Sequence, residues 1–172
     1  LRKGHKWSNG DAFTSEDFRY WWEDVANNKD ISPSGPPVVM LAEGKLPTFE
    51  VLDEVTVRFT WETPNPFFLS RLAGASPLFV YRPSAYLKKF HAKYTDEAAL
   101  NKKAKTEGQR NWAALHNRLD NMYKFSNPDQ PTLQPWVNIP RPPATRFTGR
   151  RNPYYHRIDE EGAISTGTAQ IN

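Results

Sequence analysis

The acidic residues near the N-terminus are the first whose type and spacing could do chemistry. Glu16-Asp17 and Glu23-Asp24 are two adjacent pairs of carboxylates on one short stretch. Paired carboxylates act as acid and base or nucleophile in glycoside hydrolysis. Both pairs, however, fall where the apolar spacing predicts a helix, on which acids cap the first turn or face water. We therefore expect them to be structural, and we expect no enzyme activity.

Other catalytic and metal-binding motifs are missing from the sequence. Gly74-Ala75-Ser76-Pro77 lacks the second glycine of a nucleophile elbow, and neither a Walker A loop nor G-x-G-x-x-G occurs. The absence of cysteine excludes disulfides, thiolate catalysis and cysteine-ligated zinc. We expect no cofactor and no metal, because none of the zinc-helix spacings links the four histidines, which are His5, His91, His116 and His156.

The stretch 1–25 must position the first acidic residues. We expect a strand over Leu1–Trp7 and a tight turn at Asn9-Gly10. Thr14 has the position of a helix N-cap that forms a capping box with Asp17. One face of the helix that follows is apolar, through Phe18, Trp21, Trp22 and Val25.

This stretch resembles the N-terminal signature of the family 5 extracellular solute-binding proteins, the peptide- and nickel-binding receptors of bacterial ABC importers. The residues that fit the pattern are Leu1, Arg2, Gly4, Lys6, Trp7, Ser8, Gly10, Phe13, Thr14, Glu16, Asp17 and Trp22. A second family signature, Arg-Asn-Pro-x-Tyr, appears at Arg151–Tyr155. His156 stands where the family has tryptophan, and it is either a ligand or pH-sensitive group or an ordinary hydrogen-bonded histidine.

The rest of the chain alternates short elements with proline-rich connections. We expect a β-hairpin over Thr48–Trp61 with its turn at Asp53-Glu54, and a strand over Thr145–Arg151. Turn residues predict connectors at Asn27–Thr48 and Asn127–Pro143. We expect four helices after the hairpin. The first runs from Asn65 to Gly74, where glycine would end it in the left-handed conformation, and the second covers Pro83–Phe90. The third runs from its N-cap Thr95 to Glu107 and is closed by Gly108, and the fourth begins at the N-cap Asn111.

Composition and charge limit the classes of protein. The chain has 172 residues, 38% of them hydrophobic and 13% aromatic, which is typical of one globular domain with a real core. The sequence contains no run of 18 apolar residues, which a membrane-spanning helix would need, and no signal-peptide pattern. Since the chain does not begin with Met and opens inside a predicted strand, we expect a piece of a longer protein. The net charge of +4 is concentrated after residue 60.

The predicted fold class is α+β, with a small, mainly antiparallel sheet and helices packed against it. By the resemblance, residues 1–162 would be a subdomain of the N-terminal lobe of a two-lobed receptor of the periplasmic-binding-protein type. Residues 163–172 are small and polar, and we expect a flexible tail there.

The resemblance implies capture of a peptide or similarly sized solute and delivery to a cognate ABC permease, in the periplasm or outside the cell, with a lipoprotein anchor as an alternative. Its ligand-facing residues would be Gly74, Ala75 and Ser76, with a plain connector as the alternative interpretation. The basic, aromatic-rich composition also fits a different class of protein, a module that binds single-stranded nucleic acid or glycan. Our prediction is the receptor, with no nucleic acid partner.

Overall fold

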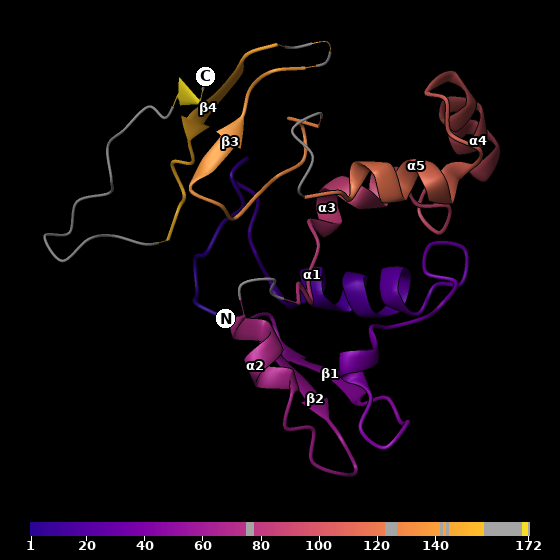
Figure 1. Cartoon of the computed structure of the whole chain (residues 1–172), viewed down its shortest axis with the longest axis vertical. Helices are drawn as coiled ribbons and strands as arrows, with labels where there is room; N and C mark the ends of the chain where they lie inside the picture. The colour runs from indigo at the N-terminus through magenta and orange to yellow at the C-terminus, as the bar shows by residue number, and fades with distance from the viewer. Residues whose placement is uncertain (75–77, 123–126, 142, 144, 157–169, 172) are drawn as a thin grey trace, which may run out of the picture. The chain divides into compact units, whose positions relative to one another are not determined.

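The computed structural model describes residues 1–74, 78–122, 127–141, 143, 145–156 and 170–171. The chain divides into two compact units (Figure 1). Unit 1 consists of Leu1–Lys3 and Thr14–Ser84, and unit 2 consists of Gly4–Phe13 and Ala85–Asn172. Each unit combines short helices with a small antiparallel sheet, which confirms the predicted α+β class.

Unit 1 begins with the predicted capped helix. In α1, Ser15–Arg19, the capping box between Thr14 and Asp17 is present, as predicted. The helix then widens into the π-helix η1, Tyr20–Ala26. Trp21, on the predicted apolar face, is only 3% exposed and belongs to the core.

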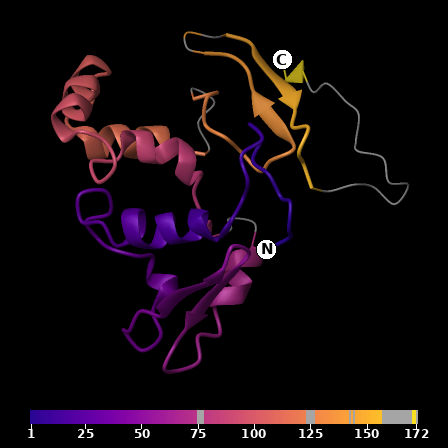
Figure 2. The ribbon, with the colours of Figure 1, turned by 180° about the vertical axis from the view of Figure 1, so that it is seen from behind.

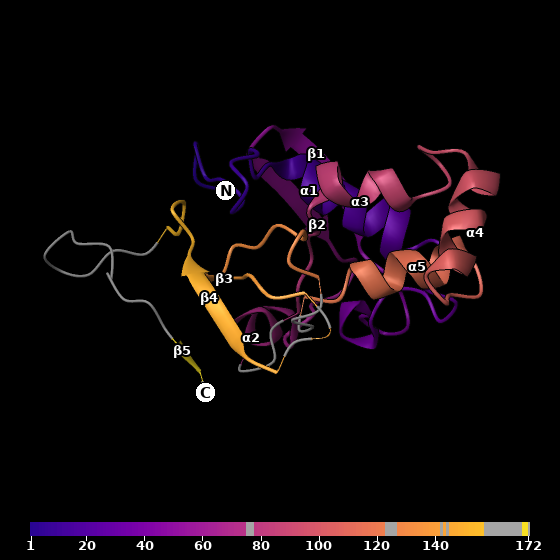
Figure 3. The ribbon, with the colours of Figure 1, turned by 90° about the horizontal axis from the view of Figure 1, so that it is seen from above.

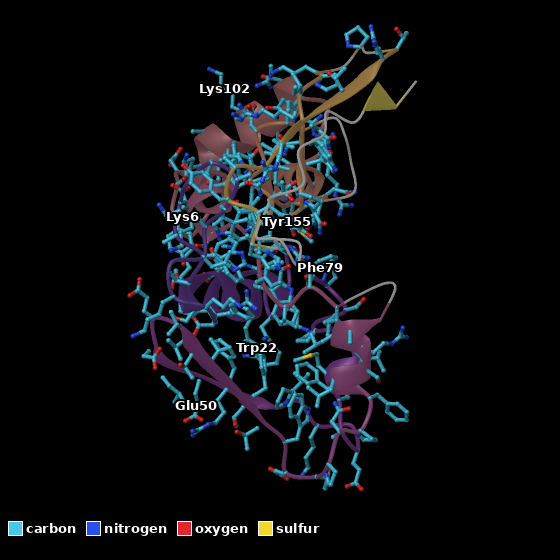
Figure 4. All side chains as sticks on the ribbon, turned by 90° about the vertical axis from the view of Figure 1, so that its left-hand side faces the viewer. Lys6, Trp22, Glu50, Phe79, Lys102 and Tyr155 are labelled. Atoms are coloured by element: carbon cyan, nitrogen blue, oxygen red, sulfur yellow. The ribbon has the colours of Figure 1, made fainter. Side chains whose placement is uncertain are left out.

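The hairpin of unit 1 lies against this helix. Strands β1, Thr48–Asp53, and β2, Thr56–Thr60, pair antiparallel, as predicted. The turn is at Glu54-Val55, one residue later than predicted, because Asp53 still pairs with Thr56. Trp22 half-buries its ring between them, with ring centroids 6.1 Å from Phe49 and 5.7 Å from Phe59. Figure 4 shows the Trp22 side chain between the helix and the hairpin. The aromatic rings therefore form the contact between the two elements.

The connector and the helix on either side of the hairpin are short. The segment before β1 contains the 3-10 turn η2, Val38–Met40, whose Met40 carbonyl accepts from the indole Nε1–H of Trp61 at 2.7 Å. After β2 comes α2, Phe68–Ala73. Asn65 does not cap this helix directly; its side chain accepts from the Phe67 amide and donates to the Val39 carbonyl.

The predicted N-terminal strand is wrong. Leu1–Trp7 forms no strand and contributes only the isolated bridge between Lys6 and Ala12, because Gly4 turns the backbone at φ +78°. The tight turn that follows is confirmed: Gly10 has φ +93°, and its amide donates to the Trp7 carbonyl at 2.9 Å. The addition of a Cβ to Gly10 would also bring it within 3.3 Å of the Tyr154 hydroxyl.

Four short described helices come after α2 in the chain, most of them in unit 2. Two of them, α4 and α5, lie side by side (Figure 3). Their bounds are α3 Ser84–Leu87, the 3-10 turn η3 Lys88–Phe90, α4 Glu97–Thr106 and α5 Trp112–Leu119. The predicted caps are right at Asn111 and wrong by one residue at Thr95, since Asp96 accepts from the Ala99 amide. The Thr95 hydroxyl instead donates to the carbonyls of Lys88 and Lys89.

Among the described residues, the sheet of unit 2 has three strands, of which β3 and β4 are the paired arrows drawn in orange to gold in Figure 2. They are β3 Trp136–Asn138, β4 Phe147–Arg151 and β5 Gln170–Ile171. β4 confirms the predicted strand, whereas β3 lies in a segment predicted as a connector. The four residues between Pro135 and Pro140 include no proline, so the backbone of β3 can pair with β4. Most of the predicted tail, 163–172, lies outside the described residues.

Candidate functional site

The loop after α2 contains the predicted ligand-facing residues. Gly74 is exposed and has φ −72° and ψ 170°, so the predicted left-handed helix end is wrong and the chain leaves α2 extended. A Cβ at Gly74 would lie 3.4 Å from the Ser70 carbonyl oxygen, which is an ordinary van der Waals contact. Ala75 and Ser76 lie outside the described residues, and the ligand-facing role of this loop stays a prediction.

The helix that carries this loop exposes apolar surface. Phe67 is 69% exposed and Leu69 is 74% exposed. Only one ring turns inward: Phe68 contacts Trp61 at 4.7 Å and Phe59 at 5.7 Å between ring centroids. The sequence offered a signal for this outcome, because five apolar residues among seven cannot all lie on one face of a short helix.

The first signature holds unit 1 together through Asp17. Its carboxylate is buried and accepts from the Thr14 amide at 3.1 Å and from the amide and hydroxyl of Ser84 at 3.0 and 2.7 Å. The Asp17 carbonyl accepts from the Arg82 amide at 3.1 Å. A buried carboxylate needs such charge-assisted partners, so this residue is structural.

The other acids of the two pairs surround Arg19. Glu16 accepts from this guanidinium twice at 2.6 Å, and Glu23 accepts at 2.6 Å. Asp24, which is 3% exposed, lies 3.3 Å from Arg19 rather than facing water. The carboxylates thus serve a helix cap and an ion-pair network, and nothing in their geometry separates an acid from a base for hydrolysis.

The second signature holds unit 2 together through Asn152, which is fully buried. Its side-chain amide donates to the carbonyls of Gln134 at 3.0 Å and Thr132 at 3.4 Å, and its side-chain oxygen accepts from the Tyr154 amide at 3.0 Å. The Asn152 amide donates to the Pro135 carbonyl at 2.8 Å. Asn152 therefore binds three backbone carbonyls of the proline-rich segment, those of Thr132, Gln134 and Pro135, and holds this segment next to the end of β4.

His156, the departure from the family pattern, meets the N-terminal stretch. Its ring centroid lies 4.9 Å from that of His5, which in turn packs edge-on against Phe13 at 5.1 Å. The structure brings the two signatures together at this point, within unit 2.

Two other histidines meet in the helical part of unit 2. His91 and His116 are buried, with ring centroids 5.7 Å apart. Among the described residues, no group of three His, Cys, Asp or Glu side chains could hold a metal ion. Nor does any described helix have the length and apolar character needed to cross a membrane.

Perturbed ionisable groups follow local hydrogen bonds and burial. The pKa of Asp53 lies below its ordinary value because its carboxylate accepts from the Val55 amide and from Thr56 in the hairpin turn. Burial raises the pKa of Tyr81 and, against a hydrogen bond from Asn127, that of Tyr86. Each of these shifts thus has a structural cause, a hydrogen bond or burial.

Known proteins resemble the chain over nearly its whole length. The periplasmic alpha-galactoside-binding protein of Rhizobium meliloti (strain 1021) is 29% identical over 163 residues, which cover 94% of this chain and 21% of that protein. A solved oligopeptide-binding protein OppA is 36% identical, with a TM-score of 0.79, over 94% of this chain and 24% of the other. The binding protein MelB of Agrobacterium fabrum C58, solved with stachyose, is 27% identical with a TM-score of 0.66, over 94% of this chain and 22% of the other.

The chain thus spans about a fifth to a quarter of the length of these relatives. The family model for the middle part of the family 5 extracellular solute-binding proteins matches residues 1–163. This chain belongs to the bacterial extracellular solute-binding proteins, family 5.

Proposed function

We propose that this chain is part of the substrate-binding component of an ABC importer, which captures peptides or solutes of similar size outside the cytoplasmic membrane. The observation that carries the proposal is the likeness to the solved oligopeptide-binding protein OppA, at 36% identity over 94% of the chain. The two signatures support it, because both are built into the fold through Asp17 and Asn152 rather than left as surface sequence. The proposed protein is a receptor without enzyme activity.

The proposed mechanism is closure of two lobes around the solute. Binding would shift the population toward the closed form through contacts that only that form makes. This chain would supply one part of one lobe, and the loop Gly74-Ala75-Ser76 would face the solute. The closed receptor would then deliver its solute to a cognate permease.

Oligosaccharides are a second candidate class of solute. The alpha-galactoside-binding relative matches over 94% of the chain, and MelB was solved with stachyose. Peptides and oligosaccharides of this size differ in how they are held: a peptide backbone offers amides and carbonyls, whereas a sugar offers hydroxyl groups and an apolar ring face. Competition between a mixed peptide library and stachyose for the same receptor distinguishes the two classes.

Titration calorimetry tests the proposal in two forms of the protein. The 172-residue chain alone should show no heat with millimolar peptide, since a pocket that buries most of a solute needs both lobes. The longer receptor that contains this chain should bind peptides or oligosaccharides in the micromolar range or tighter. Micromolar binding by the chain alone would place the pocket within these residues and contradict our assignment.

A substitution in the loop adds a sharper test. Ser76→Trp in the longer receptor should weaken solute binding at least tenfold, because a large side chain would enter the proposed cleft wall. Ser34→Trp, on an exposed position of the connector, is the matched control and should leave the affinity unchanged. Equal affinities for both variants would show that the loop does not face the solute. Salt-sensitive binding of single-stranded DNA in place of both solutes would favour the nucleic-acid alternative.

A further inference from the structure

We propose that Asn9 is a site of spontaneous deamidation whose reactivity is controlled by the fold. The turn at Asn9-Gly10 protects it while unit 2 is intact, and the asparagine converts when the turn opens. The inference is independent of the proposed transport function and of the class of solute. It rests on the chemistry of the dipeptide and on the contacts that hold the turn within unit 2.

The dipeptide Asn9-Gly10 supplies the reacting groups. An asparagine side chain is thermolabile because the backbone nitrogen of the next residue can attack its carbon Cγ. The N–Cγ bond forms, the Cγ–Nδ2 bond breaks, and Nδ2 leaves as ammonia with the proton that the backbone nitrogen gives up. Water then opens the cyclic succinimide to aspartate or isoaspartate. Glycine leaves the attack unhindered, and Asn9 is the one asparagine in this sequence that a glycine follows.

The turn keeps the attacking nitrogen protonated. The Gly10 amide donates to the Trp7 carbonyl at 2.9 Å, and the Trp7 amide donates to the Asp11 carbonyl at 2.9 Å. These bonds close a tight hairpin loop, Ser8–Gly10, in which Gly10 has φ +93°. The Gly10 nitrogen must therefore leave the Trp7 carbonyl before it can lose its proton and attack.

The Asn9 side chain is held at both of its polar atoms by Asp11. Its Nδ2 donates to the Asp11 carboxylate at 2.6 Å, and its Oδ1 accepts from the Asp11 amide at 3.2 Å. The longer bond by itself would favour the reaction, because it stabilises negative charge that develops on Oδ1. The two shorter bonds oppose the reaction, since one keeps the Gly10 nitrogen protonated and the other holds the leaving group. The closed turn is therefore the slow state.

Two contacts with distant parts of unit 2 keep the turn closed. Ser8, which is 8% exposed, shares two hydrogen bonds of 3.0 Å with Thr132, one from its amide to the carbonyl and one to its hydroxyl from the amide. Tyr154 lies beside Gly10, where an added Cβ would come within 3.3 Å of the tyrosine hydroxyl. The Lys6 ammonium lies 5.4 Å from the centroid of the same ring. Loss of these contacts frees the reactive dipeptide.

Protection comes from these bonds and contacts, and not from burial. Asn9 is exposed and Gly10 is partly exposed, so water and hydroxide have access to the turn. The rate of conversion in the folded chain is then set by the fraction of molecules in which the turn is open. Deamidation of Asn9 thus reports local opening of unit 2.

Conversion changes the turn irreversibly. Aspartate at position 9 has no Nδ2 hydrogen to donate to Asp11, and it would bring a second carboxylate beside the first. Isoaspartate adds a carbon to the backbone of a loop that two hydrogen bonds between Trp7 and its partners close tightly. A molecule whose turn has opened for long enough therefore does not regain the original turn.

Peptide mapping by mass spectrometry tests the proposal on the 172-residue chain. The folded chain and the chain in concentrated urea are incubated at the same mildly alkaline pH, and the conversion of each asparagine is followed with time. In urea Asn9 should convert before every other asparagine. In the folded chain it should convert at least about tenfold more slowly, because only molecules with an open turn react.

Two variants loosen the turn without changing the dipeptide. Ser8→Ala removes the hydroxyl that accepts from Thr132, and it should raise the rate in the folded chain about tenfold. Tyr154→Ala removes the ring beside Gly10 and should also raise the rate. The second variant decides the matter if circular dichroism shows that Ser8→Ala does not fold.

Matched controls make the result specific. Ser34→Ala changes an exposed serine of unit 1, and Tyr94→Ala removes a tyrosine that is 40% exposed, against 41% for Tyr154. Both should react within about twofold of the wild type when folded, and all four variants should react equally in urea. Equal rates for the folded and the unfolded wild type, earlier conversion of another asparagine in urea, or folded Tyr154→Ala no faster than Tyr94→Ala would overturn the proposal.

Discussion

The carboxylate of Asp17 accepts two hydrogen bonds from Ser84, one from the amide at 3.0 Å and one from the hydroxyl at 2.7 Å, across 67 residues of sequence. The same carboxylate completes the cap of α1 by accepting from the Thr14 amide. One buried side chain therefore fixes both the start of the first helix and the end of unit 1.

Asp17→Asn should destabilise the chain by about 2–3 kcal/mol, because the amide nitrogen of asparagine would face donor groups of Ser84 or Thr14. Ser84→Ala removes only the hydroxyl and should cost about 1 kcal/mol. Urea unfolding monitored by tryptophan fluorescence measures both. Ser34→Ala, at an exposed serine, should leave the midpoint unchanged; an Asp17→Asn variant as stable as this control would contradict the role of the carboxylate.

Thr14→Ala should cost about 1 kcal/mol, since the threonine hydroxyl caps α1 by accepting from the Glu16 amide at 3.3 Å. Thr14→Ser keeps the hydroxyl and should unfold within about 0.5 kcal/mol of the wild type. Denaturant midpoints of the two variants decide the matter. If alanine and serine give the same midpoint, Thr14 does not act as a cap.

Trp21→Ala should destabilise the chain by about 3–5 kcal/mol, because a ring that is 3% exposed leaves a large cavity. Trp22 packs on Phe49 and Phe59 but stays half-buried, so Trp22→Ala should cost less. Chemical unfolding measures the loss of stability in both variants. Acrylamide quenching of tryptophan fluorescence, compared between each variant and the wild type, reports how exposed the removed ring was. A larger loss for Trp22 would show that the hairpin contact outweighs the core of η1.

Asn152→Asp should destabilise unit 2 by about 3 kcal/mol or more, since a buried carboxylate would face the carbonyl oxygens of Gln134 and Thr132. Gln134→Glu makes the same chemical change on an exposed side chain and is the control. Hydrogen exchange of the β3 and β4 amides should accelerate in the first variant alone. Unchanged protection in Asn152→Asp would contradict the proposed anchoring.

Alkaline pH should weaken unit 2 through Tyr86, whose pKa is raised chiefly by burial. The phenol and the Asn127 side chain share hydrogen bonds of 3.1 and 3.2 Å. Because the folded pKa exceeds the unfolded one, the stabilisation is complete below the unfolded value of about 10 and is lost as the pH rises through the folded value. Unfolding free energies from neutral to alkaline pH should fall less steeply in Tyr86→Phe; an identical slope would contradict this assignment.

Local sequence determined the features that depend on neighbouring residues. The turn at Gly10, the capping box at Thr14, the hairpin at residues 48–61 and the cap at Asn111 each follow from side chains that bond to backbone a few residues away. Such short-range preferences operate before any tertiary contact forms. The two family motifs were also recognisable in the sequence, at Leu1–Trp22 and Arg151–Tyr155.

Only the tertiary structure decided what those motifs are for. Periodicity could not show that Asp17 would meet Ser84, that Asn152 would bind the carbonyls of Thr132 and Gln134, or that Phe67 and Leu69 would remain exposed. The strand β3 was hidden because its pairing with β4 depends on a distant partner, not on its own proline-rich surroundings. Pairing and burial of this kind are set by which surfaces meet, and the order of residues along a single stretch does not specify that meeting.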